Sequence, residues 1–259
     1  FKNPSNSVVD SIGNIYVVDR MDHKVIKFDP TGTFVFSFGG RGHSPGKLYY
    51  PWGIAISAQN EIYIADTYNN QIQVFDEMGH FVRAWGGILS GDKQFQTGPY
   101  GIAVDNSGLV YVAETFSHKI KIFDKQGKII REVGGYGNTN GKFFYPFGVA
   151  VDNFGNFYVS DTYNHRIQKF NNKGMFLLEW GGVGIGDSQF RYNYSIAVDS
   201  EGNIYVSDWQ NSRIQKFDLD GNFLGKWGSF GTRNGQFYGV LGLSVANGKI
   251  YAPDYYGKR

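Results

Sequence analysis

The sequence predicts an all-β fold, a six-bladed β-propeller of four-stranded antiparallel blades whose sixth blade is incomplete. Three observations lead to this prediction. One sequence unit recurs along the whole chain, each unit divides into four short apolar runs separated by turn residues, and helical periodicity is absent. Four strands in a unit of this length are typical of a propeller blade.

The repeat is defined by residues at fixed offsets. A tyrosine recurs every 46 to 48 residues, at Tyr16, Tyr63, Tyr111, Tyr158, Tyr205 and Tyr251. An acidic residue follows three positions later, at Asp19, Asp66, Glu114, Asp161, Asp208 and Asp254. A phenylalanine and then a turn glycine follow in the first five units, for example Phe170 and Gly174. Offsets that persist over 259 residues indicate one repeated supersecondary unit.

The unit that begins at Pro146 shows the expected strands, which are GVAVD, NFYVSD, RIQKF and MFLLEW. Short turns with glycine separate the first strand from the second and the third from the fourth. In the second strand of the following unit, Ile204 and Val206 point to one face and Tyr205 to the other. Both faces of a blade are therefore expected to be covered by neighbouring blades. The units form one domain over residues 1–259, with blades at about 4–50, 51–98, 99–145, 146–192, 193–239 and a partial blade at 240–259.

The pattern P-x-G-I-A-V-D-x-x-G-N-I-Y-V-x-D-x-x-N-x-R-I-Q-K-F-D-x-x-G resembles the NHL repeat. The resemblance covers the whole chain, is clearest in blades two to five, and implies a six-bladed NHL propeller. The sixth blade departs from the pattern, because it loses one residue in the turn Asn247–Lys249 and reaches only its first two strands by Arg259. The resemblance implies no single function, since such propellers include RNA-binding, protein-binding and extracellular sensing domains and some lyases or hydrolases.

Composition excludes several classes of function. The formal net charge is +2, which is low for a protein dedicated to duplex DNA. The chain has no cysteine, so it has neither disulfides nor thiolate metal ligands. No apolar run is long enough to span a membrane and no signal peptide is recognisable, so we expect a soluble chain whose compartment the sequence leaves unknown.

One face of the propeller is expected to carry the loops that join the fourth strand to the next blade and the second strand to the third. Binding residues commonly lie on such loops. We predict a ligand-binding site formed by aromatic residues at the channel entrance, by aromatic residues of the second loop set, and by nearby cations. The residues are Trp52, Tyr100, Phe147 and Tyr194, then Tyr68, Phe116, Tyr163 and Trp209, and finally Arg20, Lys119, Arg166 and Arg213.

Other polar patterns have structural explanations. The six repeated acidic residues are expected to accept hydrogen bonds from backbone N–H groups of the loop that follows, and the aspartates such as Asp152 before a turn to do the same. His23, His118 and His165 share one repeat position, which points to different radial sectors and does not suit a zinc site. We expect no catalytic residue, metal or cofactor.

The leading hypothesis is a non-enzymatic recognition or scaffold module that binds a protein or an extended polymeric ligand. The alternatives are single-stranded RNA binding, as in tripartite-motif–NHL proteins, and a metal-dependent lyase or lactonase. RNA binding requires a positive patch and a steep salt dependence. An open edge of the incomplete sixth blade would also permit self-association by strand addition.

Overall fold

The protein is described by a computed structural model over residues 1–87 and 94–259. These residues form five four-stranded antiparallel sheets and one two-stranded sheet. The first two blades contain β1 (Pro4–Val9), β2 (Ile15–Asp19), β3 (Lys24–Phe28), β4 (Phe34–Gly39), β5 (Ile54–Ile56), β6 (Ile62–Asp66), β7 (Gln71–Phe75) and β8 (Phe81–Gly86). The next two contain β9 (Ile102–Val104), β10 (Val110–Glu114), β11 (Lys119–Phe123), β12 (Ile129–Gly134), β13 (Pro146–Val151), β14 (Phe157–Asp161), β15 (Arg166–Phe170) and β16 (Phe176–Gly181). The fifth contains β17 (Asn193–Val198), β18 (Ile204–Asp208), β19 (Arg213–Phe217) and β20 (Phe223–Trp227), and β21 (Ser244–Ala246) and β22 (Lys249–Tyr251) follow.

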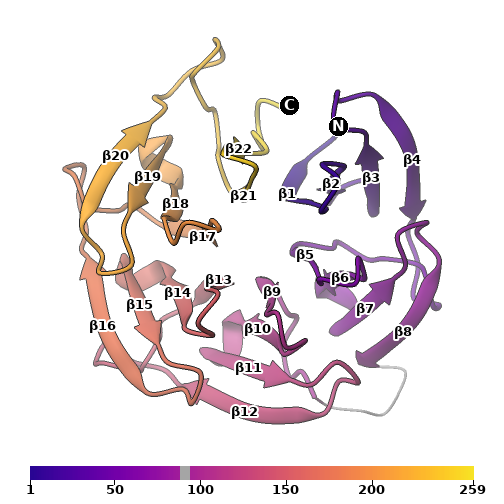
Figure 1. Ribbon diagram of the computed structural model, residues 1–259, viewed down its shortest axis with the longest axis horizontal. Helices are drawn as coiled ribbons and strands as arrows, with labels where there is room; N and C mark the ends of the chain where they lie inside the picture. The colour runs from indigo at the N-terminus through magenta and orange to yellow at the C-terminus, as the bar shows by residue number, and fades with distance from the viewer. Residues whose placement is uncertain (88–93) are drawn as a thin grey trace.

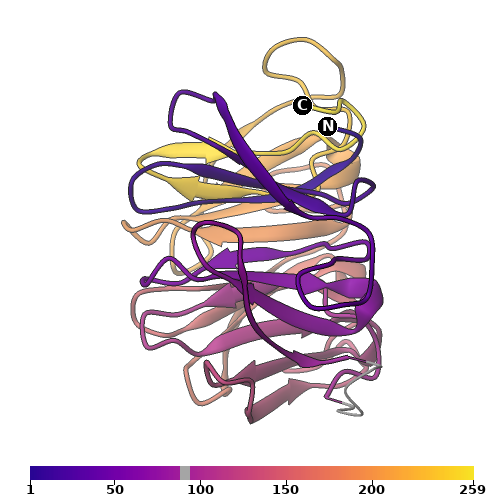
Figure 2. The ribbon, with the colours of Figure 1, turned by 90° about the vertical axis from the view of Figure 1, so that its right-hand side faces the viewer.

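The sheets are arranged radially around a central axis, with the first strand of each sheet nearest to the axis (Figure 1). Strands β4, β8, β12, β16 and β20 lie on the outside (Figure 1). Within each sheet the strands follow one another in sequence order, so each blade is a β-meander. Figure 2 shows the sheets stacked around the ring from the side. The predicted β-propeller is therefore confirmed.

The predicted count of six blades is wrong. The structure has five four-stranded blades, because residues 240–259 supply only β21 and β22, and a blade needs four strands. The two-stranded sheet lies between β17 and β1. The Ser7 and Ser244 hydroxyls lie 3.1 Å apart across the contact with β1, and the Leu243 N–H donates to Ser195 Oγ on the β17 side at 3.2 Å.

The core lies between the blades. Tyr205 packs with Leu243 on one side of β18, whereas Ile204 and Val206 pack with Tyr158 of the preceding blade on the other. Every residue of β18 is buried. This arrangement confirms the expectation that both faces of a blade are covered.

Turn chemistry also agrees with the sequence. Asp152 Oδ1 accepts hydrogen bonds from the backbone N–H groups of Phe154 and Asn156, both at 2.9 Å, before Gly155 turns the chain at φ +79°. The same Asx arrangement recurs at Asp10 and Asp199.

Short 3-10 helices connect the second and third strands of four blades. They are η1 (Thr67–Asn69), η2 (Thr115–Ser117), η3 (Thr162–Asn164) and η4 (Trp209–Asn211). Each ends at a residue in the left-handed region, such as His118 at φ 56°. None of the helices in the described ranges is long and apolar enough to cross a membrane.

Candidate ligand-binding face

The repeated acidic residues are buried and hold the two sets of loops together. Asp66 Oδ1 accepts the backbone N–H of Tyr49 at 2.7 Å, from the loop that enters the blade. Its Oδ2 accepts hydrogen bonds from the side chains of Asn69, Gln71 and Gln73. We expected donors from the backbone of the following loop. The main donors instead come from the preceding loop and from side chains, because the antiparallel register places the third strand opposite the carboxylate.

Two of the predicted cations are part of this buried network. Arg166 Nε donates to Asp161 Oδ2 at 2.7 Å, and Arg213 Nε donates to Asp208 Oδ2 at the same distance. The remaining donors of Arg213 bond the backbone oxygens of Ile185, Gly186 and Gln189. Burial raises the pKa values of Asp161 and Asp208, and the hydrogen bonds from the arginines oppose that effect. The structure therefore does not bring Arg166 and Arg213 together with the aromatic residues.

The third blade uses a different acid. Glu114 pairs with the buried Lys121, whose Nζ lies 2.9 Å from Glu114 Oε2. Lys121 occupies the repeat position that is glutamine in three other blades. The predicted cation Lys119 donates to Glu132 Oε2 at 2.7 Å. Lys119 is thus neutralised as well.

Four aromatic residues form an inner arc around the entrance of the channel. The inner arc consists of Trp52, Tyr100, Phe147 and Tyr194. Ring centroids lie 5.2 Å apart for Trp52 and Tyr100, 5.1 Å for Tyr100 and Phe147, and 4.7 Å for Phe147 and Tyr194. These three contacts are edge-to-face, a geometry that favourable aromatic pairs adopt. The structure brings these four predicted site residues into one continuous group.

An outer set surrounds the inner arc and is open to solvent. Its predicted members are Tyr68, Phe116, Tyr163 and Trp209. Tyr68 and Phe116 are 51% and 50% exposed, and Tyr163 is 39% exposed. Phe116 contacts Tyr100 at 5.7 Å, and Trp209 contacts Tyr194 at 5.3 Å. The outer set therefore extends the inner arc across the loop face.

Sequence reasoning missed three tyrosines that link these groups. Tyr50, Tyr145 and Tyr192 precede the first strands of their blades and adopt positive φ angles of 47°, 49° and 59°. The Tyr145 ring lies between Phe116 and Tyr163, at 5.5 and 5.0 Å. A tyrosine in this backbone region is strained, and such strain often occurs at functional sites.

Each of these tyrosines is held by a histidine of the preceding blade. The backbone N–H groups of Tyr50, Tyr145 and Tyr192 donate to Nδ1 of His23, His118 and His165 at 3.0, 3.0 and 3.2 Å. Burial lowers the pKa of all three histidines, which favours the neutral form that can accept this bond. A signal was present in the sequence, because Asn70 and Ser212 replace the histidine where Gly98 and Gly239 replace the tyrosine.

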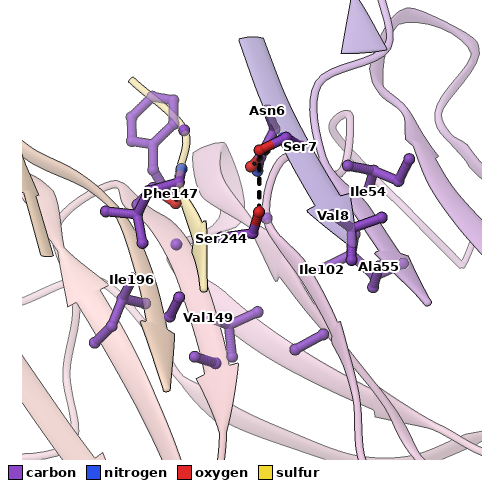
Figure 3. Close-up of a pocket in the computed structure, with 18 of the residues that line it drawn as sticks. Asn6, Ser7, Val8, Ile54, Ala55, Ile102, Phe147, Val149, Ile196 and Ser244 are labelled. Atoms are coloured by element: carbon purple, nitrogen blue, oxygen red, sulfur yellow. Dashed lines mark hydrogen bonds between the residues drawn. The ribbon is translucent and has the colours of Figure 1, made fainter. Parts of the chain in front are cut away.

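The channel behind the inner arc is a narrow cavity of about 180 Å³. Figure 3 shows aliphatic side chains such as Ile54, Ile102 and Val149 around it, with Asn6, Ser7 and Ser244 on one side. The residues that line it carry no charge. Over residues 1–87 and 94–259, no three histidine, aspartate or glutamate side chains are grouped so that they could hold a metal ion.

Comparison with known proteins gives one sequence match and several similar structures. A family model of the NHL repeat matches residues 48–75, 143–170 and 195–217. No curated protein matches this sequence. A streptogramin B lyase structure is 16% identical, with a TM-score of 0.67 over 96% of this chain and 75% of that chain.

Two further structures are similar. A virginiamycin B lyase from Staphylococcus aureus is 15% identical, with a TM-score of 0.66 over 98% of this chain and 78% of that one. A chain from a nidogen/laminin complex is 17% identical, with a TM-score of 0.71 over 96% of this chain and 87% of that chain. At such identities the similarity shows a common fold.

Proposed function

We propose that this chain, a β-propeller that carries NHL repeats, is a non-enzymatic recognition module whose loop face binds a protein or an extended ligand. The observation that carries the proposal is the continuous aromatic surface formed by the inner arc, the outer set and the three tyrosines. Half-exposed rings such as Tyr68 and Phe116 have no role in the cores between blades. Aromatic residues that are partly exposed to solvent are enriched at binding sites.

The pairing of the predicted cations favours a peptide over RNA. A single-stranded RNA site combines stacking platforms with cations that follow the phosphates. Here Lys119, Arg166 and Arg213 are paired with carboxylates, which leaves Arg20 as the single predicted cation without an acidic partner among the described residues. RNA binding and self-association through a sixth blade gain no support.

The lyases among the similar structures share the fold with this chain. Among the described residues, the lining of the channel holds no histidine, carboxylate or lysine, the side chains that most often act as a general acid or base. Three histidines have their Nδ1 atoms engaged by tyrosine N–H groups away from that lining. These observations support recognition rather than catalysis.

The test uses the exposed outer set, where substitution leaves the core intact. A random peptide display library is selected on the wild-type chain, and the enriched peptides are measured against a Tyr68→Ala, Phe116→Ala, Tyr163→Ala triple variant. We expect the triple variant to lose binding. Phe154→Ala is the matched control, because Phe154 is 75% exposed in a turn of the opposite face and should leave binding unchanged.

Two outcomes would contradict the proposal. Either no peptide is enriched, or the enriched peptides bind the triple variant as tightly as the wild type. Oligo(U) is measured in parallel over a range of salt concentrations, because tight and steeply salt-dependent binding of oligo(U) would favour RNA instead.

A further inference from the structure

Three residues that follow the buried acids depart from the repeat. In blades two to four this position is Thr67, Thr115 or Thr162, whose hydroxyl donates to a backbone oxygen that begins the next blade, at 2.8, 2.7 and 2.8 Å. The other units have Arg20, Trp209 and Tyr255 here. Trp209 contacts Tyr194, and Arg20 lies over the rings of Tyr50 and Trp52. The Tyr255 hydroxyl in turn accepts a hydrogen bond from Arg20. These three residues do not make the hydrogen bond that threonine makes at this position of the repeat, so the repeat does not explain why they are there.

Arg20 lies beside two aromatic rings of the loop face. Its guanidinium carbon lies 4.9 Å from the Trp52 ring centroid and 5.5 Å from that of Tyr50. Nη1 donates to the Tyr255 hydroxyl at 3.3 Å. Nε is buried and has no hydrogen-bond partner within the described residues. Nη2 also makes no hydrogen bond to the described residues and, unlike Nε, is not buried, so it can donate to a bound ligand.

The nearby carboxylates are already engaged. Asp19 accepts the backbone N–H groups of Lys2 and Asn3, and Asp22 pairs with Lys2 and Lys24. In the described ranges, Arg20 therefore has no ion-pair partner, in contrast to Arg166 and Arg213, which bond their acids at 2.7 Å. Arg20 differs from these two in having its charge available.

The inner arc is open on the side of Arg20. Its aromatic residues belong to blades two to five, whereas the corresponding positions in the first blade and the C-terminal segment are the small Ser5 and the aliphatic Leu241. The entrance thus has an aromatic wall on one side and a single cation beside Trp52 on the other. This arrangement suits a ligand with an apolar group next to one negative charge.

We propose that Arg20, supported by Tyr255 and Trp52, binds a carboxylate of a peptide partner, with a neighbouring apolar side chain of that peptide packed on the inner arc. The proposal rests on the proposed recognition function and names the chemistry of its partner. The planar fork of a guanidinium matches a carboxylate. A phosphate carries about −1.5 to −2 charges and calls for several cations, and Arg20 is the one cation that the described residues place beside Trp52.

The experiment uses peptides selected on the wild-type chain from the random library. Each acidic peptide is synthesised in two forms that differ only in having glutamate or glutamine, or aspartate or asparagine. We expect the acidic form to bind about ten- to a hundredfold more tightly, the range for a charge-assisted hydrogen-bonded contact. Arg20→Gln should remove this preference, and Arg20→Lys should restore part of it because the charge returns without the fork.

Arg191→Gln is the matched control. Arg191 is exposed in a loop of the same face and makes no ion pair among the described residues, so the variant changes the net charge equally. An equal loss in Arg191→Gln and Arg20→Gln would show a general electrostatic effect and overturn the proposal. Displacement of the peptide by millimolar inorganic phosphate would overturn the assignment to a carboxylate.

The two proposals fail in different ways. If selected peptides depend on the outer set but their acidic and amide forms bind equally, recognition stands and the carboxylate site is wrong. The carboxylate site is also wrong if acidic residues are not enriched in the selection. If no selected peptide depends on the outer set, the recognition function itself is wrong.

Discussion

Replacing Arg166 with alanine removes four hydrogen bonds from the buried network of the fourth blade. They join Nε to Asp161 at 2.7 Å, Nη1 to Glu179 at 2.6 Å, and Nη2 to the backbone oxygens of Thr139 and Lys142 at 3.0 Å each. Asp161 is completely buried. Removal of one partner from a buried ion pair costs about 3–5 kcal/mol.

The lower end of that range applies here. Asp161 keeps hydrogen bonds from the Phe144 backbone N–H and from the side chains of Asn164 and Gln168, so its charge stays partly compensated. We therefore expect Arg166→Ala to lower the free energy of unfolding by about 3 kcal/mol, a large part of the roughly 5–15 kcal/mol typical of a domain.

Arg166→Gln should be milder. In the second blade, Gln71 occupies the equivalent position and donates to Asp66 at 2.8 Å. A glutamine at position 166 can make the same bond to Asp161. It loses the partly exposed ion pair with Glu179 and the two contacts to neutral carbonyls, each of these contacts being worth about 0.5–1.5 kcal/mol. We expect a net cost of about 1–2 kcal/mol.

Urea unfolding followed by tryptophan fluorescence measures these differences, provided that circular dichroism gives the same transition. Arg20→Gln serves as a comparison, because Arg20 makes one hydrogen bond and no ion pair in the described part of the chain, and should cost less than about 1 kcal/mol. The reasoning is refuted if Arg166→Ala costs under about 1 kcal/mol, or if alanine and glutamine at position 166 are equally destabilising.

Two further predictions concern stability. Burial lowers the pKa of His23, His118 and His165 below 6.5, so the unfolded chain takes up protons first; stability is full above about pH 6.5 and falls as the pH drops from 6.5 toward the folded-state pKa. Urea midpoints compared at about pH 7.5 and about pH 5.5 should show this fall. A triple variant with asparagine at positions 23, 118 and 165, the residue that the second blade has at Asn70, should show a smaller fall. An unchanged fall would assign the pH dependence to other groups. Gly127→Ala should be more destabilising than Gly32→Ala in thermal unfolding, because both glycines have φ near +90° but a Cβ on Gly127 would overlap the Trp85 ring, whereas the space around Gly32 is open; equal shifts would mean that the ring moves aside freely.

The repeat made most of the fold predictable. A residue type that recurs at the same offset in each unit indicates the same structural position in each unit. The repeated tyrosine and the acid after it predicted the second strand of each blade, which the structure confirms in β2, β6, β10, β14 and β18. The blade count failed, because the segment that carries Tyr251 and Asp254 has the repeat's first half and forms two strands. A repeated motif therefore indicates a unit but does not guarantee the whole blade.

The site was less predictable, because similar residue types have different neighbours. Arg166 lies directly opposite Asp161 in the strand register, which explains its burial, and a register argument from the sequence would have found that pair. Arg20 follows its acid immediately and points elsewhere. The left-handed conformation of Tyr145 has no signal in its own residue type, and only its co-occurrence with His118 indicates it.

The histidine–tyrosine bonds also limit how the blades can be rearranged. Each bond joins a histidine in one blade to the backbone that begins the blade after it. The two partners therefore remain adjacent only if the order of the blades is kept. Placing the blade that follows Tyr145, together with this tyrosine, after the one that contains Asn70 would deprive the Tyr145 N–H of its histidine acceptor. The blades look interchangeable in outline, yet these contacts specify which neighbour each one accepts. Shuffled or duplicated versions of this ring would need the matching histidine moved with its tyrosine.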